Sequence, residues 1–520
     1  MNDERPPSLW WGMWKRFLLA GVLIVAFSAA ATATVALNKI TTLADEIFPR
    51  LSHINAPKGL LTPEYGGGPQ TFLILGSDRR TGSKNAEERD ASPHSDTILL
   101  VRFDPEQGQT SVLSIPRDLM VNIDTPSGQV YANEKINAAY TIGSEMGGAS
   151  EASILAAETI KHEVFPELTL NGIIDVNFSG FINVVDTLGC AYVNVDHRYF
   201  NENEGTTETD YTNINIEPGY QKLCYENALD YVRYRHDDSD FVRVARQQDF
   251  LRDLREQIDP SDELGEIDNV AKAVGHAIRT NFPASPQELI LLTKLIAFSQ
   301  SKPLRQVKFL AANDDYQLNN ADYVTSTPEL EKQTLNTFLN GHEALRLPAP
   351  PAPAAHATGR SHHHTRHHSQ PGFSLAALGL VPTATSGQDE LVKAAPEIPF
   401  PVLYPRLQTG DAEQQQVRAY PLRNQQNIRH HAYVIVFQQN RVEDGYYDFE
   451  GTDWLNPPLF AHARTQVIDG VEYRFVDDGS HIHVIGWRAG NTLYWVTNTL
   501  LEELSNQQMI QIAKSAKPLR

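Results

Sequence analysis

The chain has 520 residues, a formal net charge of −20 at pH 7 and an apolar content of 41%. This length exceeds what one ordinary hydrophobic core serves, so two globular domains are the starting expectation. The excess of acids and the lack of a basic stripe argue against a nucleic-acid partner. A small anionic ligand is still allowed, because a local cluster of arginines can reverse the field inside a cleft.

The N-terminal part of the chain carries a candidate membrane anchor. Residues 17–36 form an apolar, uncharged run of about the 20 residues that a helix needs to cross a bilayer. Lys15 and Arg16 precede the run, which predicts a cytoplasmic tail at 1–16 and places the rest of the chain outside the cell membrane. A cleavable signal peptide is the alternative, because small residues suited to cleavage end the run. Residues 37–69 then form a polar stalk.

Between residues 70 and 345 short apolar runs alternate with helical patterns. Strands are expected at 71–75, 97–103 and 110–115, and Gly108 belongs to a hairpin turn between the last two. Helical periodicity occurs at 150–164, 228–231, 242–258 and 286–299. This mixture predicts an α/β or α+β sandwich with helices over a central sheet.

The composition changes twice after this domain. Residues 346–398 are rich in Pro, Ala, Ser and His, which predicts an extended, semi-rigid linker. A metal site in its histidine-rich stretch is less favoured than a solvated linker, because no second shell would fix the ligands. Residues 399–520 regain strand patterns and end in an amphipathic helix at 501–516, which predicts a small α+β domain. The extended linker predicts that this domain is not held rigidly against the first. Since residues 400–520 offer no cluster of acids and arginines like that of the first domain, we predict that the second domain is dispensable for chemistry.

The chain contains two cysteines, Cys190 and Cys224. Outside the membrane a disulfide is permitted, and closing this loop would contribute on the order of 4 kcal/mol in the chain-entropy model. Two buried thiols are the alternative. We predict the disulfide.

Two aspartates stand at the ends of neighbouring expected strands. Asp78 follows an apolar strand through Gly76, and Asp96 opens the next strand. Either residue alone would be interpreted as a turn former. Two carboxylates that converge from adjacent strand ends suit Mg²⁺ or Mn²⁺, which prefer oxygen ligands.

Arginines are frequent in the same region, where they would suit the oxygens of a diphosphate. Arg117 follows the strand-ending Pro116, and Asp118 is expected to orient it. Arg233 and Arg235 are two apart, so they share a face if that segment is extended.

A second group of polar residues follows at helical spacing. Asp240, Arg243 and Gln247 fall on one face of the expected helix, and Arg246 lies close by. A ladder of surface salt bridges is the alternative interpretation of this spacing. The position of the group directly after two arginines favours an anion-binding role.

These segments occur in an order that resembles a known family. They read Gly-Ser-Asp-Arg-Arg at 76–80, Ser-Asp-Thr at 95–97, Ile-Pro-Arg-Asp at 115–118, Lys-Ile-Asn-Ala-Ala-Tyr at 135–140, Val-Asn-Phe-Ser-Gly-Phe at 176–181 and Val-Arg-Tyr-Arg-His at 232–236. Together they resemble the LytR–CpsA–Psr family, the membrane-anchored phosphotransferases of bacterial cell-wall assembly. The resemblance is strong from about 71 to 250 and weak to about 311.

The resemblance implies an α-β-α sandwich with a central mixed sheet and assigns the metal to Asp78 and Asp96. It implies that a set of donors holds the pyrophosphate of the substrate: Arg80, Arg117, Arg233, Arg235, Arg243, Arg246 and Gln247. Arg117 is the expected catalytic arginine, and Asp240 is a candidate general base.

The implied reaction moves a glycopolymer from a polyprenyl-diphosphate carrier onto a peptidoglycan hydroxyl. Two alternatives are a pyrophosphatase that uses water at the same site and a non-enzymatic lipid-diphosphate binder or envelope regulator.

Overall fold

The computed structural model describes residues 52–62, 67–78, 93–202, 213–234, 240–257, 278–281, 304–319, 321–341, 375–384, 386–440 and 445–519, and four further helical positions, 288, 291, 295 and 298. The candidate anchor at 17–36 and residues 346–374 of the expected linker lie outside these ranges. Residues from 375 onward form part of the second domain, which therefore begins before the expected boundary at 399. Within the described ranges, no helix is both long enough and apolar enough to cross a membrane.

The first domain is built on a seven-stranded mixed sheet with the order β1-β12-β7-β2-β3-β4-β13. The sheet contains parallel pairs, such as β2 with β7, and antiparallel pairs, such as β2 with β3. The strands are β1 (Ser52–His53), β2 (Gln70–Ser77), β3 (Ser95–Asp104), β4 (Gln109–Ser114), β7 (Gly172–Asn177), β12 (Ile278–Thr280) and β13 (Leu304–Val307). The predicted central mixed sheet is therefore confirmed, with the three expected strands corresponding to β2, β3 and β4.

Helices cover both faces of this sheet. α3 (Ala138–Thr159) and α9 (Pro328–Asn340) pack on one face, where Leu75 and Leu100 share a buried cluster with residues of both helices. On the other face the helical residues Leu291 and Leu295 pack against Phe72. The two faces are served by alternate residues of a strand, because successive side chains point to opposite sides.

A smaller layer of three helices and four short strands extends the first domain. It comprises α4 (Phe178–Thr187), β8 (Ala191–Val195), β9 (Tyr199–Asn201), β10 (Ile214–Ile216), β11 (Gly219–Leu223), α5 (Tyr225–Arg233) and α6 (Asp240–Glu256). Two hairpins, β5 (Met120–Asp124) with β6 (Val130–Lys135) and β14 (Asn313–Leu318) with β15 (Ala321–Thr325), complete the domain. The helices expected at 150–164, 228–231 and 242–258 correspond to α3 with the π-helical turn Ile160–Val164, to α5 and to α6.

The C-terminal part of the chain forms a second domain around a seven-stranded antiparallel sheet with the order β19-β20-β21-β25-β24-β23-β22. Its strands are β19 (Ala412–Arg423), β20 (Arg429–Gln439), β21 (Gly445–Thr452), β22 (Arg464–Ile468), β23 (Val471–Asp478), β24 (His481–Ala489) and β25 (Thr492–Thr497). α10 (Ser386–Ala394) and α11 (Asn506–Ser515) pack against this sheet, and short strands β16 (Leu380–Pro382), β17 (Leu403–Tyr404), β18 (Leu407–Thr409) and β26 (Lys517–Pro518) complete the domain.

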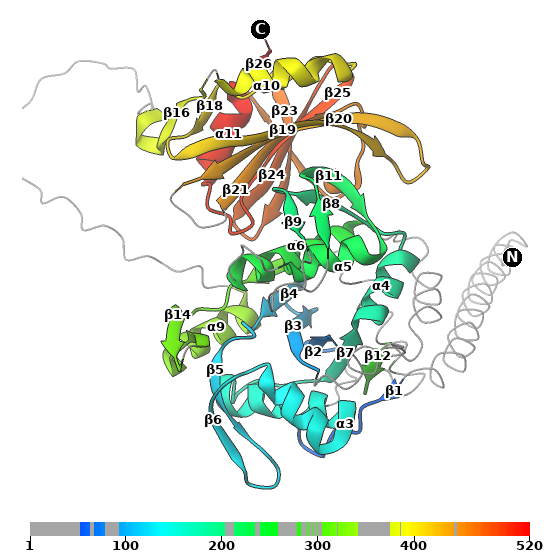
Figure 1. Cartoon of the computed structure of the whole chain (residues 1–520), viewed down its shortest axis with the longest axis vertical. Helices are drawn as coiled ribbons and strands as arrows, with labels where there is room; N and C mark the ends of the chain where they lie inside the picture. The colour runs from blue at the N-terminus through cyan, green and yellow to red at the C-terminus, as the bar shows by residue number, and fades with distance from the viewer. Residues whose placement is uncertain are drawn as a thin grey trace, which may run out of the picture.

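The two domains are packed directly against each other, with α6, β8 and β11 of the first domain next to the second (Figure 1). Tyr192 and Tyr220 of the first domain belong to one buried aromatic cluster with Tyr420, Trp454 and Trp495 of the second. The expectation of a second domain that is not held against the first is therefore wrong. The composition of the linker says how two domains are connected, but it carries no information about whether their surfaces match.

Candidate active site

The two aspartates lie where β2 ends and β3 begins. The pairing of these strands is regular up to Gly76 opposite Thr97 and then shifts by one residue, which leaves Asp96 as the extra residue of a β-bulge. A Cβ atom at position 76 would lie 2.9 Å from the Cβ of Thr97, so the close approach requires glycine. Asp78 continues beyond β2, and its Oδ1 accepts the backbone N–H of His94 at 2.7 Å. The bulge therefore places two carboxylates at the same end of the strand pair.

The charges of these two carboxylates interact. Burial raises the pKa of Asp78, and the nearby charge of Asp96 raises it further. Burial also acts to raise the pKa of Asp96, but the positive charges of Arg117 and Arg243 outweigh it and lower this pKa overall. Asp96 is therefore held as an anion. An additional cation nearby would stabilise the ionised form of Asp78 as well. The proposed metal coordination by this pair stays a prediction.

Arg117, in the segment that follows β4, contacts Asp96. Its Nη1 forms an ion pair with Oδ1 of Asp96, and its Nε lies 3.4 Å from Oδ2 of Asp118. Lys135 binds the other oxygen of Asp118 at 2.8 Å. Asp118 thus lies between two cations and contacts Arg117 as expected of an orienting residue. The side chain of Arg117 is 12% exposed, so its guanidinium is largely desolvated.

Arg243 approaches the aspartates from α6. It is only 2% exposed, and its charge acts on Asp96. A guanidinium buried this deeply does not belong to a surface ladder of salt bridges, so that alternative fails for Arg243. The structure brings together Asp78, Asp96, Arg117 and Arg243 from four separate segments of the chain.

One other predicted residue has local partners, and several lie beyond the described part of the chain. Arg233 is the last residue of α5 rather than part of an extended segment, and it pairs with Asp230 at 2.5 Å. The expectation that it shares a strand face with Arg235 is therefore wrong for Arg233. Arg80, Arg235 and the side chain of Asp240 lie outside the described residues.

Arg246 and Gln247 contact the protein's own backbone. Arg246 is fully buried and donates from Nη1 to the carbonyl oxygens of Tyr231 and Tyr234, at 3.1 and 3.0 Å. Gln247 donates from Nε2 to the carbonyl oxygen of Val232 at 3.0 Å. These carbonyls lie at the C-terminal end of α5, where the helix has no intrahelical donors left. The two side chains thus tie α6 to α5, and a direct contact of either with the pyrophosphate stays a prediction.

The charge of Arg246 is balanced inside the protein. Its Nε donates to the hydroxyl of Tyr199 at 3.1 Å, and that hydroxyl bonds to Oδ1 of Asp196 at 2.5 Å. Burial opposes ionisation of Asp196, but His197, Tyr199 and Arg246 together lower its pKa. Arg246 therefore has a buried counter-anion, which supports a structural role.

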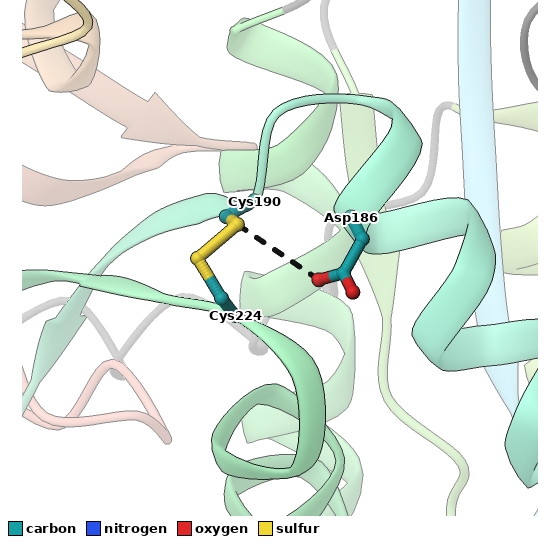
Figure 2. Close-up of side chains that lie close together, drawn as sticks. All are labelled: Asp186, Cys190 and Cys224. Atoms are coloured by element: carbon teal, nitrogen blue, oxygen red, sulfur yellow. Dashed lines mark hydrogen bonds between the residues drawn. A yellow bond between two sulfur atoms is a disulfide. The ribbon is translucent and has the colours of Figure 1, made fainter.

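The predicted Cys190–Cys224 disulfide is confirmed, with the two Cα atoms 4.8 Å apart (Figure 2). Asp186 lies beside it, and its Oδ1 accepts the backbone N–H of Tyr225 at 2.9 Å. These are the only described residues that bring three potential ligands of the His, Cys, Asp and Glu types together, but sulfurs joined in a disulfide are not thiolate ligands. The bridge joins the turn after α4 to the start of α5.

Sequence reasoning missed one buried acid next to the site. Asp175 of β7 is fully buried and accepts hydrogen bonds from the hydroxyls of Ser77, at 3.1 Å, and Tyr140, at 2.8 Å. It fixes the end of β2, directly before Asp78. An aspartate inside the apolar run Gly-Ile-Ile-Asp-Val-Asn at 172–177 was the available signal, because a buried carboxylate requires partners.

A strand pair that presents acids to buried arginines offers oxygen ligands for a cation and donors for an anion. The sequence model of the LytR_cpsA_psr family matches residues 39–338, more than half of the chain. The chain therefore belongs to the LytR–CpsA–Psr family. The second domain, from residue 375 onward, lies beyond the match.

Named relatives have similar sequences. An uncharacterised protein of Staphylococcus aureus strain NCTC 8325 is 31% identical over 231 residues, covering 44% of this chain and 51% of the relative. The polyisoprenyl-teichoic acid–peptidoglycan teichoic acid transferase TagV of Bacillus subtilis strain 168 is 28% identical over 249 residues, covering 47% and 58%. The chain thus spans between half and two thirds of the length of these relatives. The crystal structure of B. subtilis TagV aligns with a TM-score of 0.40 and 24% identity, covering 52% of this chain and 96% of that one.

Proposed function

We propose that this protein is an extracytoplasmic phosphotransferase that moves a glycopolymer from a polyprenyl-diphosphate carrier onto a peptidoglycan hydroxyl. The observation that carries this proposal is the grouping of Asp78, Asp96, Arg117 and Arg243 at one end of the β2–β3 pair. Family membership supports the reaction class, as do the names of relatives described as transferases of teichoic acid to peptidoglycan.

In the proposed reaction an acceptor hydroxyl attacks the sugar-proximal phosphorus of the donor. A new P–O bond to the acceptor forms, the P–O bond to the bridging oxygen breaks, and polyprenyl phosphate leaves. The hydroxyl proton passes to a base, for which Asp240 stays the candidate. Positioning and neutralisation of charge supply most of the catalysis in such transfers. In this proposal Arg117 and Arg243 would hold phosphoryl oxygens, and their burial, which shields them from water, supports this role.

A divalent cation, Mg²⁺ or Mn²⁺, fits the residues present. Asp78 and Asp96 offer only oxygen ligands, which these cations prefer. A cation would offset the burial and the repulsion from Asp96 that together raise the pKa of Asp78. When bound, it would neutralise charge on the diphosphate and polarise the phosphoryl group. Asp96 would then be shared between the cation and Arg117.

We also propose that residues 17–36 anchor the protein, with the two domains outside the cell membrane. The disulfide supports an oxidising location, because such bridges persist in secreted and surface proteins.

The test is transfer by the purified full-length chain, given a short-chain polyprenyl-diphosphate glycan, Mg²⁺ and a soluble peptidoglycan fragment. We expect equal amounts of polyprenyl phosphate and of glycan covalently joined to the fragment, measured by mass spectrometry. Arg117→Ala should lower turnover by about 100-fold or more, since one lost donor to developing charge has this effect. The exposed Arg429→Ala serves as the matched control.

Two outcomes would overturn the proposal. Polyprenyl phosphate and free glycan phosphate without any joined product would indicate a pyrophosphatase. Donor binding without turnover, unaffected by Arg117→Ala, would indicate a binding protein.

A further inference from the structure

α6 is buried on two opposite sides, which is unusual for a helix so rich in charge. One side carries Val242, Ala245, Asp249, Arg252 and Glu256, spaced three and four residues apart and therefore aligned on one face. Val242 and Ala245 form a buried apolar cluster with Leu500 of the second domain. At the other end of the same stripe, Oε2 of Glu256 lies 3.5 Å from Nε2 of His462. The second domain therefore contacts α6 along its length.

The opposite side of α6 faces the first domain. Arg246 and Gln247 bind the carbonyl groups at the end of α5, and Phe250 and Leu254 belong to the buried cluster of that layer. Arg243 on this side acts on Asp96. Any movement of α6 relative to the sheet would therefore change the position of Arg243 in the candidate active site.

A continuous chain of buried polar groups fixes the contact between α6 and the second domain. Arg252 Nη2 lies 2.7 Å from Nε2 of His483, and Nδ1 of His483 lies 2.5 Å from Oε1 of Glu502. In the neutral tautomer whose Nε2 accepts from Arg252, Nδ1 carries the proton that is donated to Glu502. All three side chains are less than 10% exposed.

The same chain continues into the sheet of the first domain. Arg252 pairs with Asp249 at 3.0 Å, and Nε2 of Gln306, on β13, donates to Oδ1 of Asp249 at 2.7 Å. Displacing α6 along the interface would leave charged groups buried without partners, which is strongly unfavourable. The chain therefore holds the helix in one position between the two domains.

We propose that the second domain is a positioning element for α6, and that His483 and Glu502 are positioning residues for the transfer reaction. They hold Arg252, and through it they fix α6, the helix that also carries Arg243. This inference rests on the proposed function for its effect on turnover. Its structural part, the immobilisation of α6, can be tested without any turnover.

The experiment compares full-length wild type with His483→Ala, His483→Gln and Glu502→Gln. A glutamine at 483 can both accept from Arg252 and donate to Glu502, so it is the rescuing variant. His481→Ala, an exposed histidine on the same strand, is the control. Hydrogen exchange of the amides at 240–257 and binding of geranylgeranyl diphosphate with Mg²⁺ are measured, followed by the transfer assay.

We expect faster exchange throughout α6 in His483→Ala and Glu502→Gln, with unchanged exchange in β2 and β3. Turnover should fall by about 10- to 100-fold at a nearly constant KM for the acceptor, because small misplacements of catalytic groups have effects of this size. His483→Gln should return the exchange of α6 and the turnover close to their wild-type values.

Wild-type exchange in α6 and wild-type diphosphate affinity in His483→Ala would overturn the positioning role. Loss of exchange protection in β2 and β3 of His483→Ala would also overturn this role, because His483 would then support the whole fold and not the position of α6. If α6 loosens as expected but wild type shows no transfer, the positioning inference stands and the proposed function fails.

Discussion

Glu450 provides a direct test of how the buried interface responds to pH. It lies on β21, is fully buried, and its Oε2 accepts the backbone N–H of Tyr220 from the first domain at 3.0 Å. The hydroxyl of Tyr420 donates to the same oxygen at 2.8 Å. Asp448, two residues earlier on the same face of the strand, is also fully buried and is bound by Asn194 at 3.1 Å.

Burial raises the pKa of Glu450 from 4.5 to about 7, against the lowering effect of its hydrogen bonds. Between these two pH values the folded protein keeps a proton that the unfolded chain has lost. Stability from this group is therefore fully present below about pH 4.5 and is lost as the pH rises to about 7. At 1.36 kcal/mol per pKa unit the loss is on the order of 3 kcal/mol.

Glu450→Gln keeps the shape and an acceptor oxygen but removes the titration. As the pH rises from 4.5 to 7.5, the free energy of unfolding of the variant should increase by on the order of 3 kcal/mol relative to that of wild type. Burial and the charge of Glu450 both raise the pKa of Asp448, so the substitution also eases ionisation of Asp448 and acts in the same direction.

The assay is urea unfolding of the full-length chain at several pH values, followed by the fluorescence of the interface tryptophans Trp454 and Trp495. The exposed Glu472→Gln should show the wild-type profile. Parallel pH profiles for wild type and Glu450→Gln would refute the reasoning, because they would mean that Glu450 ionises in the folded protein as it does in the unfolded chain.

Three further predictions concern the site and its supports. Asp96→Asn should weaken Mg²⁺ binding by at least 10-fold in calorimetry, whereas an unchanged affinity would remove this residue from the metal site. Reduction of the disulfide, or Cys224→Ser, should lower the free energy of unfolding by about 4 kcal/mol in urea titrations, given the separation of 34 residues; equal midpoints would mean that the bridge does not restrict the unfolded chain. Gly219→Ala should destabilise the domain interface in thermal unfolding, because the glycine has a φ of +105° and an added Cβ would lie 2.6 Å from a tyrosine hydroxyl of the second domain. An alanine variant as stable as wild type would show that the interface can relax around this position.

The local pattern of the chain was sufficient for three strands of the first sheet and for part of the site. Apolar runs bounded by turn residues predicted β2, β3 and β4, since alternating burial and chain reversal are encoded within a few residues. The placement of Asp78 and Asp96 at strand ends followed from the same runs. The identity of Asp96 as a bulge residue did not, because a bulge depends on the partner strand.

The tertiary structure decided what each arginine does. Arg243 and Arg246 are separated by three residues on one helix, yet one acts on Asp96 and the other binds carbonyl groups of α5. Sequence spacing places both on the same side of the helix but cannot state which acceptor lies opposite each one. The same limit applies to Gln247.

Only the tertiary structure also revealed that the second domain buries the other side of α6. The pairing of Arg252 with His483 joins residues 231 positions apart, and the sequence around either residue does not indicate the other. A charged helix with two buried sides resembles a surface helix in sequence, because its charges are neutralised by partners that are distant along the chain. The residues determine which elements form, whereas the complementarity of distant surfaces decides which charges meet.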